Sequence, residues 1–495
     1  MRCGACMSHY LAFDLGAESG RATLGTLEAQ RLTLEELHRF PNQPVRVLSA
    51  LHWDTLGLWQ EIRRGLTIAG REKGSRLDGI GVDTWGVDFA LVGQDGNLVE
   101  NPRHYRDVRT NGMMEAVFRV IPREEIFAHT GVQFMQINTL YQLYAMRMAG
   151  SRALACARTL LMTPDLFNYW LTGVAKSEAT IASTSQFYNP TLQRWAVELF
   201  DRLYLPKTIL PELVPPGTRL GTLLAEVADA CGFGATTVYA TGCHDTASAV
   251  AAVPASGESW CYISSGTWSL MGVELDGPLI NPRSLALNLT NEMGAGGKTR
   301  LLKNIAGLWL LQECRRAWAL AGREYGYEEL ALMAADAPPF SAMLDPDAFL
   351  EPGDMPAKIA AHCQSTGQKP PDSVRATARA ILESLALRYR EVLESLEHLL
   401  GRKLEIIHIV GGGSRNRVLN QFVADATNHT VVAGPSEATA MGNILIQAIG
   451  AGEVSGLKEA REIVERSVTL ETFTPKRSAD WDRAYEKFLS LTRRS

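Results

Sequence analysis

Two segments that lie far apart in the sequence share one layout, an apolar strand, a short turn of small residues and a second strand. The first is DLGAESGRATL, which begins at Asp14, and the second is SSGTWSLMGVE, which begins at Ser264. Small residues let a backbone bend sharply between two strands. The letters of the two segments are only weakly similar, but the repeated layout predicts a duplicated core with one such turn in each half.

The surrounding pattern predicts alternating strands and helices. Residues 10–40 read as three short strands in an antiparallel meander, 55–72 as an amphipathic helix, and Ile80–Val92 as a stretch of strand character that carries two aspartates. Residues 376–400 have the apolar spacing of a long helix. After it, the strand LEIIHIV, a helix over 416–428, the strand TVVAGP and a helix over 436–449 follow in turn. This order is typical of the α/β class.

Length and charge narrow the range of partners. A chain of 495 residues is too long for one ordinary core and predicts two large domains, with three as the alternative. The formal net charge of -5 gives no basic field for nucleic acid and no polybasic stretch for an anionic membrane. A small molecule is the partner that remains.

The sequence also carries expectations about location and redox state. It has neither an apolar run long enough to span a membrane nor the layout of a secretory signal, so we expect a cytoplasmic protein. The 8 cysteines are scattered, unlike a disulfide framework, and we expect reduced thiols. Cys3 and Cys6 form a C-x-x-C with no second pair at metal spacing, and we assign it no function.

The first candidate site is the turn DLGAESGR, from Asp14 to Arg21. Its backbone amides could converge on one anion, with Ser19 and Arg21 adding side-chain donors, so it is a candidate phosphate cradle. An ordinary hairpin explains the motif about equally well. The segment lacks the spacing of a P-loop. Asp14 leads the turn from a strand end, where a carboxylate could hold hydrated Mg2+, although turn capping would also account for it.

Two further glycine-rich turns are candidate nucleotide contacts. SSGTWS, from Ser264 to Ser269, supplies hydroxyls at a strand-to-strand turn, and Thr267 is the residue that we place nearest the terminal phosphates. GGGSRN, from Gly411 to Asn416, lies between a strand and a helix, where glycines let a flat ring approach the backbone. A solvated turn hydroxyl and an ordinary glycine loop are the alternative interpretations.

The fourth candidate is GCHDT, which places Asp245 between an apolar strand and a helix of small residues. Aspartate at a helix start is most often a cap, and capping alone would explain it. The functional alternative is a general base that accepts a hydroxyl proton as that hydroxyl attacks a phosphoryl group. His244 beside it could donate to the same substrate, or could simply be a packed histidine.

These four segments, in this order, resemble the FGGY carbohydrate kinases, a family of the actin, heat-shock chaperone and hexokinase superfamily. Other stretches resemble the branch of that family that acts on L-rhamnulose, and together they extend from residue 10 to beyond 440: GVDTWGVDF, YRDVRTNG, NTLYQL, HDTASAV, SSGTWSLMG, LKNIAGLWLLQ and IVGGGSRN. The resemblance implies an α/β fold of two actin-like (ribonuclease H-like) ATPase domains with a nucleotide and sugar cleft between them. The corresponding boundaries are a leader over 1–9, an N-terminal domain over 10–249 and a C-terminal domain over 250–495.

The resemblance also implies roles for individual residues. Asp245 becomes the catalytic base, and Asp14 is the candidate Mg2+ ligand. The positions that correspond to ATP contacts are Ala17, Glu18, Ser19, Gly20, Arg21, Thr267 and Gly413. The positions that correspond to sugar contacts are Gly86, His244, Asp245, Thr246, Asn304 and Gln312. We expect Asn304 and Gln312 to lie on one helix, where their spacing of eight residues returns to roughly the same face, so that both could face the cleft. An amide on the helix surface is the alternative for Gln312. Glu18 departs from the serine of many relatives, and it could turn away, pair with Arg21 or contribute only its amide.

The implied reaction is transfer of the ATP γ-phosphoryl group, with Mg2+, to the 1-hydroxyl of L-rhamnulose in L-rhamnose catabolism. A kinase for another ketose, L-fuculose or xylulose, is the nearest alternative. A non-kinase actin-like ATPase clamp is the alternative from another class, although the HDT segment would have no obvious purpose there. The sequence leaves the oligomeric state open.

Overall fold

The computed structural model describes residues 7–73, 77–476 and 479–492 and separates them into two compact units. Unit 1 contains the chain up to Pro254, Glu274–Leu301 and Ala438–Ser467. Unit 2 contains Ala255–Val273, Leu302–Glu437 and the chain from Val468 onward. The chain therefore passes between the units several times, and the predicted division near residue 250 stays a prediction. Cys3 and Cys6 lie outside the described residues.

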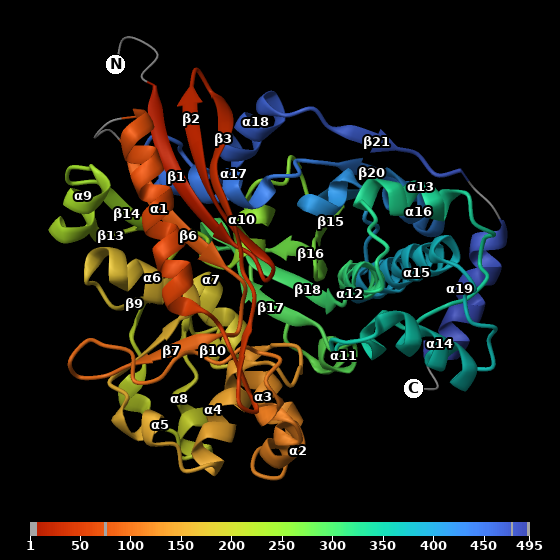
Figure 1. Cartoon of the computed structure of the whole chain (residues 1–495), viewed down its shortest axis with the longest axis horizontal. Helices are drawn as coiled ribbons and strands as arrows, with labels where there is room; N and C mark the ends of the chain where they lie inside the picture. The colour runs from red at the N-terminus through yellow and green to blue at the C-terminus, as the bar shows by residue number, and fades with distance from the viewer. Residues whose placement is uncertain (1–6, 74–76, 477–478, 493–495) are drawn as a thin grey trace. The chain divides into compact units, whose positions relative to one another are not determined.

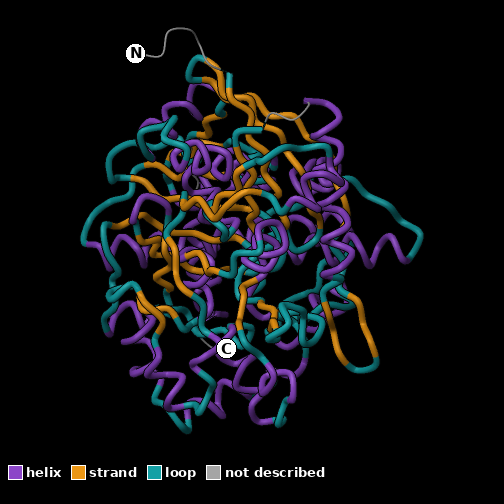
Figure 2. Tube along the Cα trace, turned by 90° about the vertical axis from the view of Figure 1, so that its left-hand side faces the viewer, coloured by secondary structure: helices purple, strands orange, loops and turns teal. Residues whose placement is uncertain are grey.

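Helices and strands alternate along the described residues and are mixed in space (Figure 2), as the α/β class requires. The elements of unit 1 are β1 Ser8–Leu15, β2 Ser19–Glu28, β3 Arg31–Pro41, β4 Val45–Val47, β5 Ala50–His52, α1 Thr55–Lys73, β6 Gly79–Thr84, β7 Phe89–Val92, α2 Met113–Phe118, α3 Arg123–Thr130, α4 Thr139–Met148, α5 Arg152–Cys156, β8 Thr159–Met162, α6 Thr163–Thr172, β9 Lys176–Glu178, α7 Ala179–Ala182, β10 Tyr188–Asn189, β11 Arg194–Trp195, α8 Val197–Arg202, β12 Glu212–Val214, β13 Thr218–Thr222, α9 Ala225–Cys231, β14 Thr237–Ala240, α10 Asp245–Ala251, α11 Pro282–Ala286, β17 Thr290–Met293, α17 Ala438–Gly450 and α18 Leu457–Ser467.

The elements of unit 2 are β15 Trp260–Ser265, α12 Trp309–Leu320, α13 Tyr327–Ala335, α14 Met355–Ser365, α15 Val374–Leu400, β19 Ile406–Val410, α16 Arg417–Thr427, β20 Thr430–Ala433, β21 Glu471–Phe473 and α19 Ala479–Thr492. Two strands, β16 Ser269–Leu275 and β18 Thr299–Ile305, contain residues of both units.

A six-stranded sheet forms the centre of unit 1, in the order β13-β14-β6-β1-β2-β3. The predicted meander is confirmed, because β1, β2 and β3 pair antiparallel in sequence order (Figure 1). β6 pairs parallel with β1 and with β14. The helix predicted over 55–72 is α1, and the residue Gly65 of α1 packs on Phe13 and Ala22 of the sheet. Gly25 and Gly81 face α17 on the opposite side, so helices cover both faces.

The sheet of unit 2 repeats the pairing of unit 1. β16 and β15 are antiparallel, β15 and β19 are parallel, β19 and β20 are parallel, and β20 and β21 are antiparallel. The strands β2, β1, β6, β14 and β13 have the same succession of pairings in unit 1. The repeated turn in the sequence therefore does mark a repeated strand arrangement. The chain order of the last two strands differs, because β13 precedes β14 whereas β21 follows β20.

The segment 80–92 differs from the expectation of continuous strand character. It forms two strands, β6 and β7, which are separated by residues 85–88. Val87 has φ +66°, a backbone conformation that breaks an extended strand and that β-branched residues rarely adopt. The other predicted strands and helices are found with small shifts of their ends, such as α15 at Val374–Leu400.

The expectations about thiols and about membrane-spanning segments can both be compared with the structure. The cysteines at 156, 231, 243, 261, 314 and 363 are all free thiols. Among the described residues, no helix is both long and apolar enough to cross a membrane.

Helices α10 and α17 of unit 1 make an unusually close contact, which a substitution can test. A Cβ at Gly442 of α17 would lie 1.8 Å from the carbonyl oxygen of Ser248 in α10, so Gly442→Ala must push the helices apart. We expect this change to lower the free energy of unfolding by about 1–3 kcal/mol, measured by urea denaturation. Gly234→Ala is the matched control, because its Cβ would meet open space. Equal stability of the two variants would show that the helices are not in this contact.

Candidate active site

The carboxyl ends of three parallel strands gather acidic side chains in unit 1. Asp14 of β1 and Asp83 of β6 are register partners, so their side chains point to the same face of the sheet. Thr84 forms a parallel bridge with His244, which precedes Asp245 at the start of α10. The edge at which parallel strands end is where α/β folds bind their ligands. The structure thus brings the predicted Asp14 and Asp245 to one edge and adds Asp83 to them.

The turn between β1 and β2 closes on itself through the backbone. Gly16 N donates to Ser19 O at 3.0 Å, and Asn42 Nδ2 donates to Gly16 O at 2.7 Å. Arg21 Nε donates to Asp14 Oδ2 at 3.0 Å, so the strand-end carboxylate and the turn arginine form an ion pair. A Cβ at Gly20 would lie 2.3 Å from the ring of Phe40, which explains the glycine. Ala17, Ser19 and Arg21 are partly exposed at this turn and Glu18 is exposed.

Asp83 is fully buried and was not among the predicted site residues. Asn443 Nδ2 of α17 donates to Asp83 Oδ2 at 2.5 Å, and Gln447 Nε2 donates to Asn443 Oδ1 at 2.7 Å. Within the described part of the chain, Asp83 Oδ1 has no hydrogen-bond partner. Burial raises the pKa of Asp83 well above its usual value, and the charge of Asp14 raises it further. The signal in the sequence was an aspartate inside an apolar strand, which is costly unless it has a purpose.

Asp245 combines access to solvent with a raised pKa. Its side chain is 29% exposed, and Oδ1 accepts from Thr246 N at 2.5 Å and from Thr246 Oγ1 at 3.1 Å. Burial of the remainder raises the pKa of Asp245, and although His244 opposes this shift, Asp14 adds to it. A carboxylate with a raised pKa holds a proton more readily, which suits a general base. The N-cap position of α10 is His244, with no side-chain cap hydrogen bond, and Asp245 is the first residue of the helix, so the capping interpretation of Asp245 is wrong.

The loop that leads into α10 is held by buried groups that the sequence did not reveal. His244 N donates to Thr180 Oγ1 at 3.1 Å, and Cys243 N donates to Glu178 Oε2 at 3.1 Å. Thr180 Oγ1 in turn donates to Glu178 Oε2 at 2.5 Å. Burial raises the pKa of Glu178 to about 7, while these hydrogen bonds lower it in part. This network fixes the backbone on which His244 and Asp245 stand.

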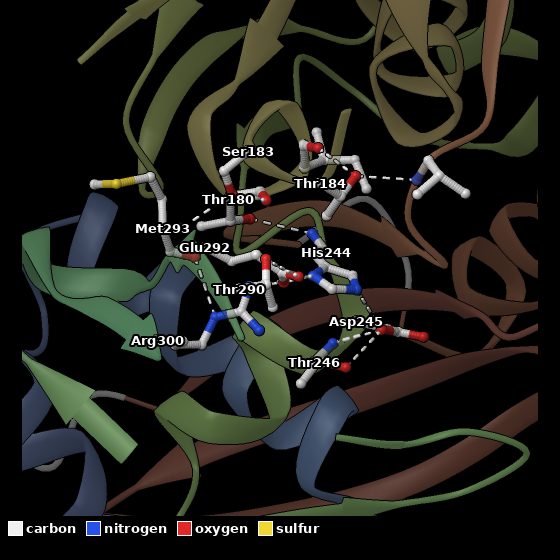
Figure 3. A network of polar contacts seen from close by, with 12 residues as sticks. Thr180, Ser183, Thr184, His244, Asp245, Thr246, Thr290, Glu292, Met293 and Arg300 are labelled. Atoms are coloured by element: carbon white, nitrogen blue, oxygen red, sulfur yellow. Dashed lines mark hydrogen bonds and ion pairs between the residues drawn. The ribbon is translucent and has the colours of Figure 1, made fainter. Parts of the chain in front are cut away.

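The side chain of His244 contacts two further charged residues, as Figure 3 shows. His244 Nε2 lies 3.4 Å from Asp245 Oδ1. Its Nδ1 lies 3.2 Å from Glu292 Oε2 and 3.1 Å from Arg300 Nη2. Glu292 and Arg300 come from β17 and β18, more than forty residues after His244 in the printed sequence. No local motif marks either residue, so sequence reasoning missed both.

The predicted sugar contact Gly86 lies in the strained link between β6 and β7. A Cβ at Gly86 would lie 3.1 Å from the side chain of Thr184, so the backbone passes close to that residue. Val87 N donates to Thr184 Oγ1 at 3.0 Å, and Thr139 Oγ1 donates to Val87 O at 2.6 Å. These bonds hold Val87 in its left-handed conformation. A strained backbone conformation of this kind persists only where surrounding contacts hold it in place, and such places are often functional sites.

The carboxylate of Asp88, at the end of the same link between β6 and β7, is a buried hydrogen-bond acceptor. Its Oδ2 accepts from Trp53 Nε1 at 2.6 Å, Trp85 Nε1 at 3.0 Å and the Tyr105 backbone N at 3.2 Å, and its Oδ1 accepts from Gln142 Nε2 at 3.0 Å. Burial raises the pKa of Asp88 to about 6, against the opposing effect of these donors. The indole of Trp85 is therefore a buried support for this link.

Unit 2 brings its own predicted residues together. Gly266 N donates to Trp268 O at 2.9 Å, which closes the turn that carries the partly exposed Thr267. Trp309 N at the start of α12 donates to Thr267 O at 3.1 Å. A Cβ at Gly413 would lie 2.0 Å from Ser265 Oγ, so the GGGSRN loop packs directly on the SSGTWS segment. Only glycine fits there, and the two predicted nucleotide turns are neighbours within this unit.

The expectation that Asn304 and Gln312 share a helix is wrong. Asn304 lies in strand β18 and Gln312 in helix α12. The link between them passes Gly307, whose Cβ would lie 2.7 Å from Ser269 N, and this close backbone approach ends the strand before the helix begins. Because the two residues lie in different elements, their spacing of eight residues does not place them on a common helix face. Gln312 Oε1 is buried and has no partner among the described residues, so its amide is not an ordinary surface group.

The described residues contain no group of three or more histidine, cysteine or acidic side chains arranged to hold a metal ion. Mg2+ rarely needs such a group, because it commonly uses one or two carboxylates together with phosphate oxygens and water. Asp14 and the unpartnered Oδ1 of Asp83 are hard oxygen ligands of this type. They fit a Mg2+ ion that arrives with a nucleotide.

The Asp88 network generates a prediction for stability. Asp88→Asn keeps the shape of the side chain, but an amide has only one acceptor oxygen, so its NH2 group must face an N–H donor. We expect the free energy of unfolding to fall by about 1–3 kcal/mol in urea denaturation. Asp229→Asn, at an exposed position of α9, is the matched control. If Asp88→Asn were as stable as the control, the carboxylate would not hold these donors.

Comparisons with known proteins cover almost the whole chain. The N-terminal domain of the FGGY family of carbohydrate kinases matches residues 9–252, and the C-terminal domain of the same family matches residues 261–451. A rhamnulokinase of Bacteroides thetaiotaomicron is 46% identical over 487 residues, which is 98% of this chain and 99% of the relative. A rhamnulokinase of Enterococcus faecalis is 41% identical and covers 94% of each chain.

Solved structures agree on the fold. The xylulose kinase of Lactobacillus acidophilus superposes with a TM-score of 0.78 at 15% identity, covering 98% of this chain and 96% of that one. The xylulose kinase of Rhodospirillum rubrum gives a TM-score of 0.76 at 20% identity and covers 98% of both chains. These likenesses confirm the predicted two-domain α/β fold. The domain matches and the similar rhamnulokinases identify the chain as a member of the FGGY family of carbohydrate kinases.

Proposed function

We propose that this chain transfers the γ-phosphoryl group of ATP to the 1-hydroxyl of L-rhamnulose, giving L-rhamnulose 1-phosphate and ADP. The observation that carries this proposal is the match to relatives named rhamnulokinase over 98% of the chain at 46% identity. The candidate base and the first phosphate turn both fall within the N-terminal match over 9–252.

In this proposal Asp245 is the general base. Its accessible side chain and raised pKa support that role, because the base must reach the attacking hydroxyl and take its proton. Asp245 would deprotonate and orient the 1-hydroxyl while His244 and Thr246 position the sugar. Gly86 offers backbone at a point where a Cβ would lie only 3.1 Å from the side chain of Thr184. Asn304 and Gln312 stay proposed sugar contacts from unit 2.

The phosphates are assigned to the two turns. The β1–β2 turn would contribute amides from Ala17 to Gly20 and the guanidinium of Arg21, while Thr267 and Gly413 would contact the nucleotide from unit 2. Phosphoryl transfer needs alignment and charge neutralisation more than covalent chemistry. Mg2+, held by Asp14 with Asp83 beside it, would neutralise phosphate charge when bound. Glu18 is proposed to contribute its backbone amide, because its exposed carboxylate would repel phosphate.

The first experiment measures ADP formation with and without L-rhamnulose. A sugar kinase forms ADP quickly only when its sugar is present, because water must be excluded from the reacting phosphoryl group. An ATPase clamp of the same superfamily would turn over ATP at the same rate without sugar. Sugar-independent turnover would therefore contradict the proposed function.

Replacing the proposed base gives a sharper prediction. Asp245→Asn keeps the shape of the side chain but removes the proton acceptor, and we expect kcat to fall about 10²- to 10⁴-fold. Calorimetry should find sugar and ATP affinities within a few-fold of those of the unchanged protein. Asp229→Asn serves again as the exposed control. Turnover close to normal in pure Asp245→Asn would remove Asp245 from the catalytic role.

The choice of sugar can be tested by kcat/KM for four ketoses under one set of conditions. L-Fructose adds a hydroxyl at the methyl end of L-rhamnulose, and apolar contacts reject an added hydroxyl only weakly, by about a hundredfold. L-Fuculose, with one inverted hydroxyl, and D-xylulose should be rejected more strongly, because they leave buried polar groups unpaired. If either sugar outperformed L-rhamnulose, the substrate would be wrong while the kinase assignment stood.

A further inference from the structure

Both ring nitrogens of His244 face charged groups in unit 1, and the side chain is only 7% exposed. Asp245 lies on the Nε2 side, while Glu292 and Arg300 lie on the Nδ1 side (Figure 3). A neutral imidazole carries its single hydrogen on one nitrogen and accepts with the other. The groups around Nδ1 therefore decide whether His244 donates or accepts toward Asp245.

Arg300 is held in a fixed position. Its side chain is completely buried, and its Nε donates to the carbonyl oxygen of Met293 at 3.1 Å. Its Nη2 lies 3.1 Å from Glu292 Oε2 and 3.1 Å from His244 Nδ1. Each terminal nitrogen of a guanidinium has two hydrogens and no lone pair to offer. Nη2 can thus donate one hydrogen to Glu292 and the other to His244.

This geometry conflicts with a hydrogen on Nδ1. A hydrogen of Arg300 Nη2 points at Nδ1 across 3.1 Å, and a second hydrogen on Nδ1 would be directed into the same space. Glu292 Oε2 lies 3.1 Å from Arg300 Nη2, and a carboxylate oxygen only accepts hydrogen bonds. The carboxylate therefore serves as the acceptor that orients Arg300.

We propose that Arg300, oriented by Glu292, holds His244 as the neutral tautomer that carries its hydrogen on Nε2. In this state the one hydrogen on Nε2 lies on the side of Asp245, 3.4 Å from its Oδ1, and it can be donated to a bound sugar hydroxyl. Nε2 then has no free lone pair with which to take a proton. Asp245 is then the only member of the pair that can accept the hydroxyl proton. Arg300 and Glu292 are positioning residues, and this consequence for catalysis rests on the proposed function.

The tautomer is measured by nitrogen NMR on full-length protein labelled with 15N-histidine. The His244 signals are assigned by their loss in His244→Gln. We expect one protonated nitrogen, Nε2, and one unprotonated nitrogen, Nδ1, at neutral pH. A wild-type spectrum with hydrogen on Nδ1, or on both nitrogens, would overturn the proposal without need of any variant. This measurement uses no substrate, so its result does not depend on which sugar the protein phosphorylates.

Variants then test the cause. In Arg300→Met, Glu292 loses its donor and becomes the acceptor for Nδ1, so we expect the hydrogen to appear on Nδ1. Arg300→Lys keeps a cation that can donate, and it should restore the Nε2 signal. Arg283→Met, at an exposed position of α11, should leave the spectrum unchanged. An unchanged His244 spectrum in folded Arg300→Met would overturn the role of Arg300.

Kinetics provide a second readout. Loss of the Nε2 donor should raise the sugar KM and lower kcat, up to about 100-fold in kcat/KM for Arg300→Met, with partial recovery in Arg300→Lys and an unchanged KM for ATP. A purely structural role would instead lower the amount of active protein without changing the KM for the sugar. Equal sugar KM values in wild type and Arg300→Met would contradict the proposal, even if sugar-dependent ADP formation itself were normal.

Discussion

The concentration of negative charge at one sheet edge is the constraint on which the rest of unit 1 depends. Asp14, Asp83 and Asp245 meet where parallel strands end, and like charges in a partly buried place oppose one another. Each carboxylate has its own partner in the fold. Arg21 forms an ion pair with Asp14, Asn443 donates a hydrogen bond to Asp83, and Thr246 donates one to Asp245. The surplus negative charge that remains is what a metal ion bound to phosphates would relieve.

Sequence patterns predicted well those features that are local. A turn between two strands and an amphipathic helix are set by neighbours along the chain, so the β1–β3 meander, α1 and α15 were predicted close to their observed bounds. The candidate site residues that came from short motifs also group as expected within each unit. The loop of Gly413 packs on Ser265 in the segment that also carries Thr267, and Asp14 and Asp245 interact electrostatically at their edge.

The features that sequence patterns missed depend on contacts between distant segments. Asn304 and Gln312 were placed on one helix because nothing in the letters shows that Gly307 must pass against Ser269. The turn at Val87 interrupts a run of β-forming residues only because Thr139 and Thr184 hold its backbone. Glu292 and Arg300 carry no motif, and their relation to His244 exists only after β17 and β18 are in place.

The return of the chain to unit 1 has a consequence for biosynthesis. Asp83 is paired with Asn443, a residue 360 positions later, and the face of the sheet that holds Gly25 and Gly81 is covered by the same helix. At ribosomal speeds of about 5–20 residues per second, that helix emerges roughly 20–70 s after Asp83. During this interval the face of the sheet that α17 covers stays open, and Asp83 still lacks its amide partner. Unit 1 is therefore complete only when a helix made 360 residues after Asp83 has docked on its sheet.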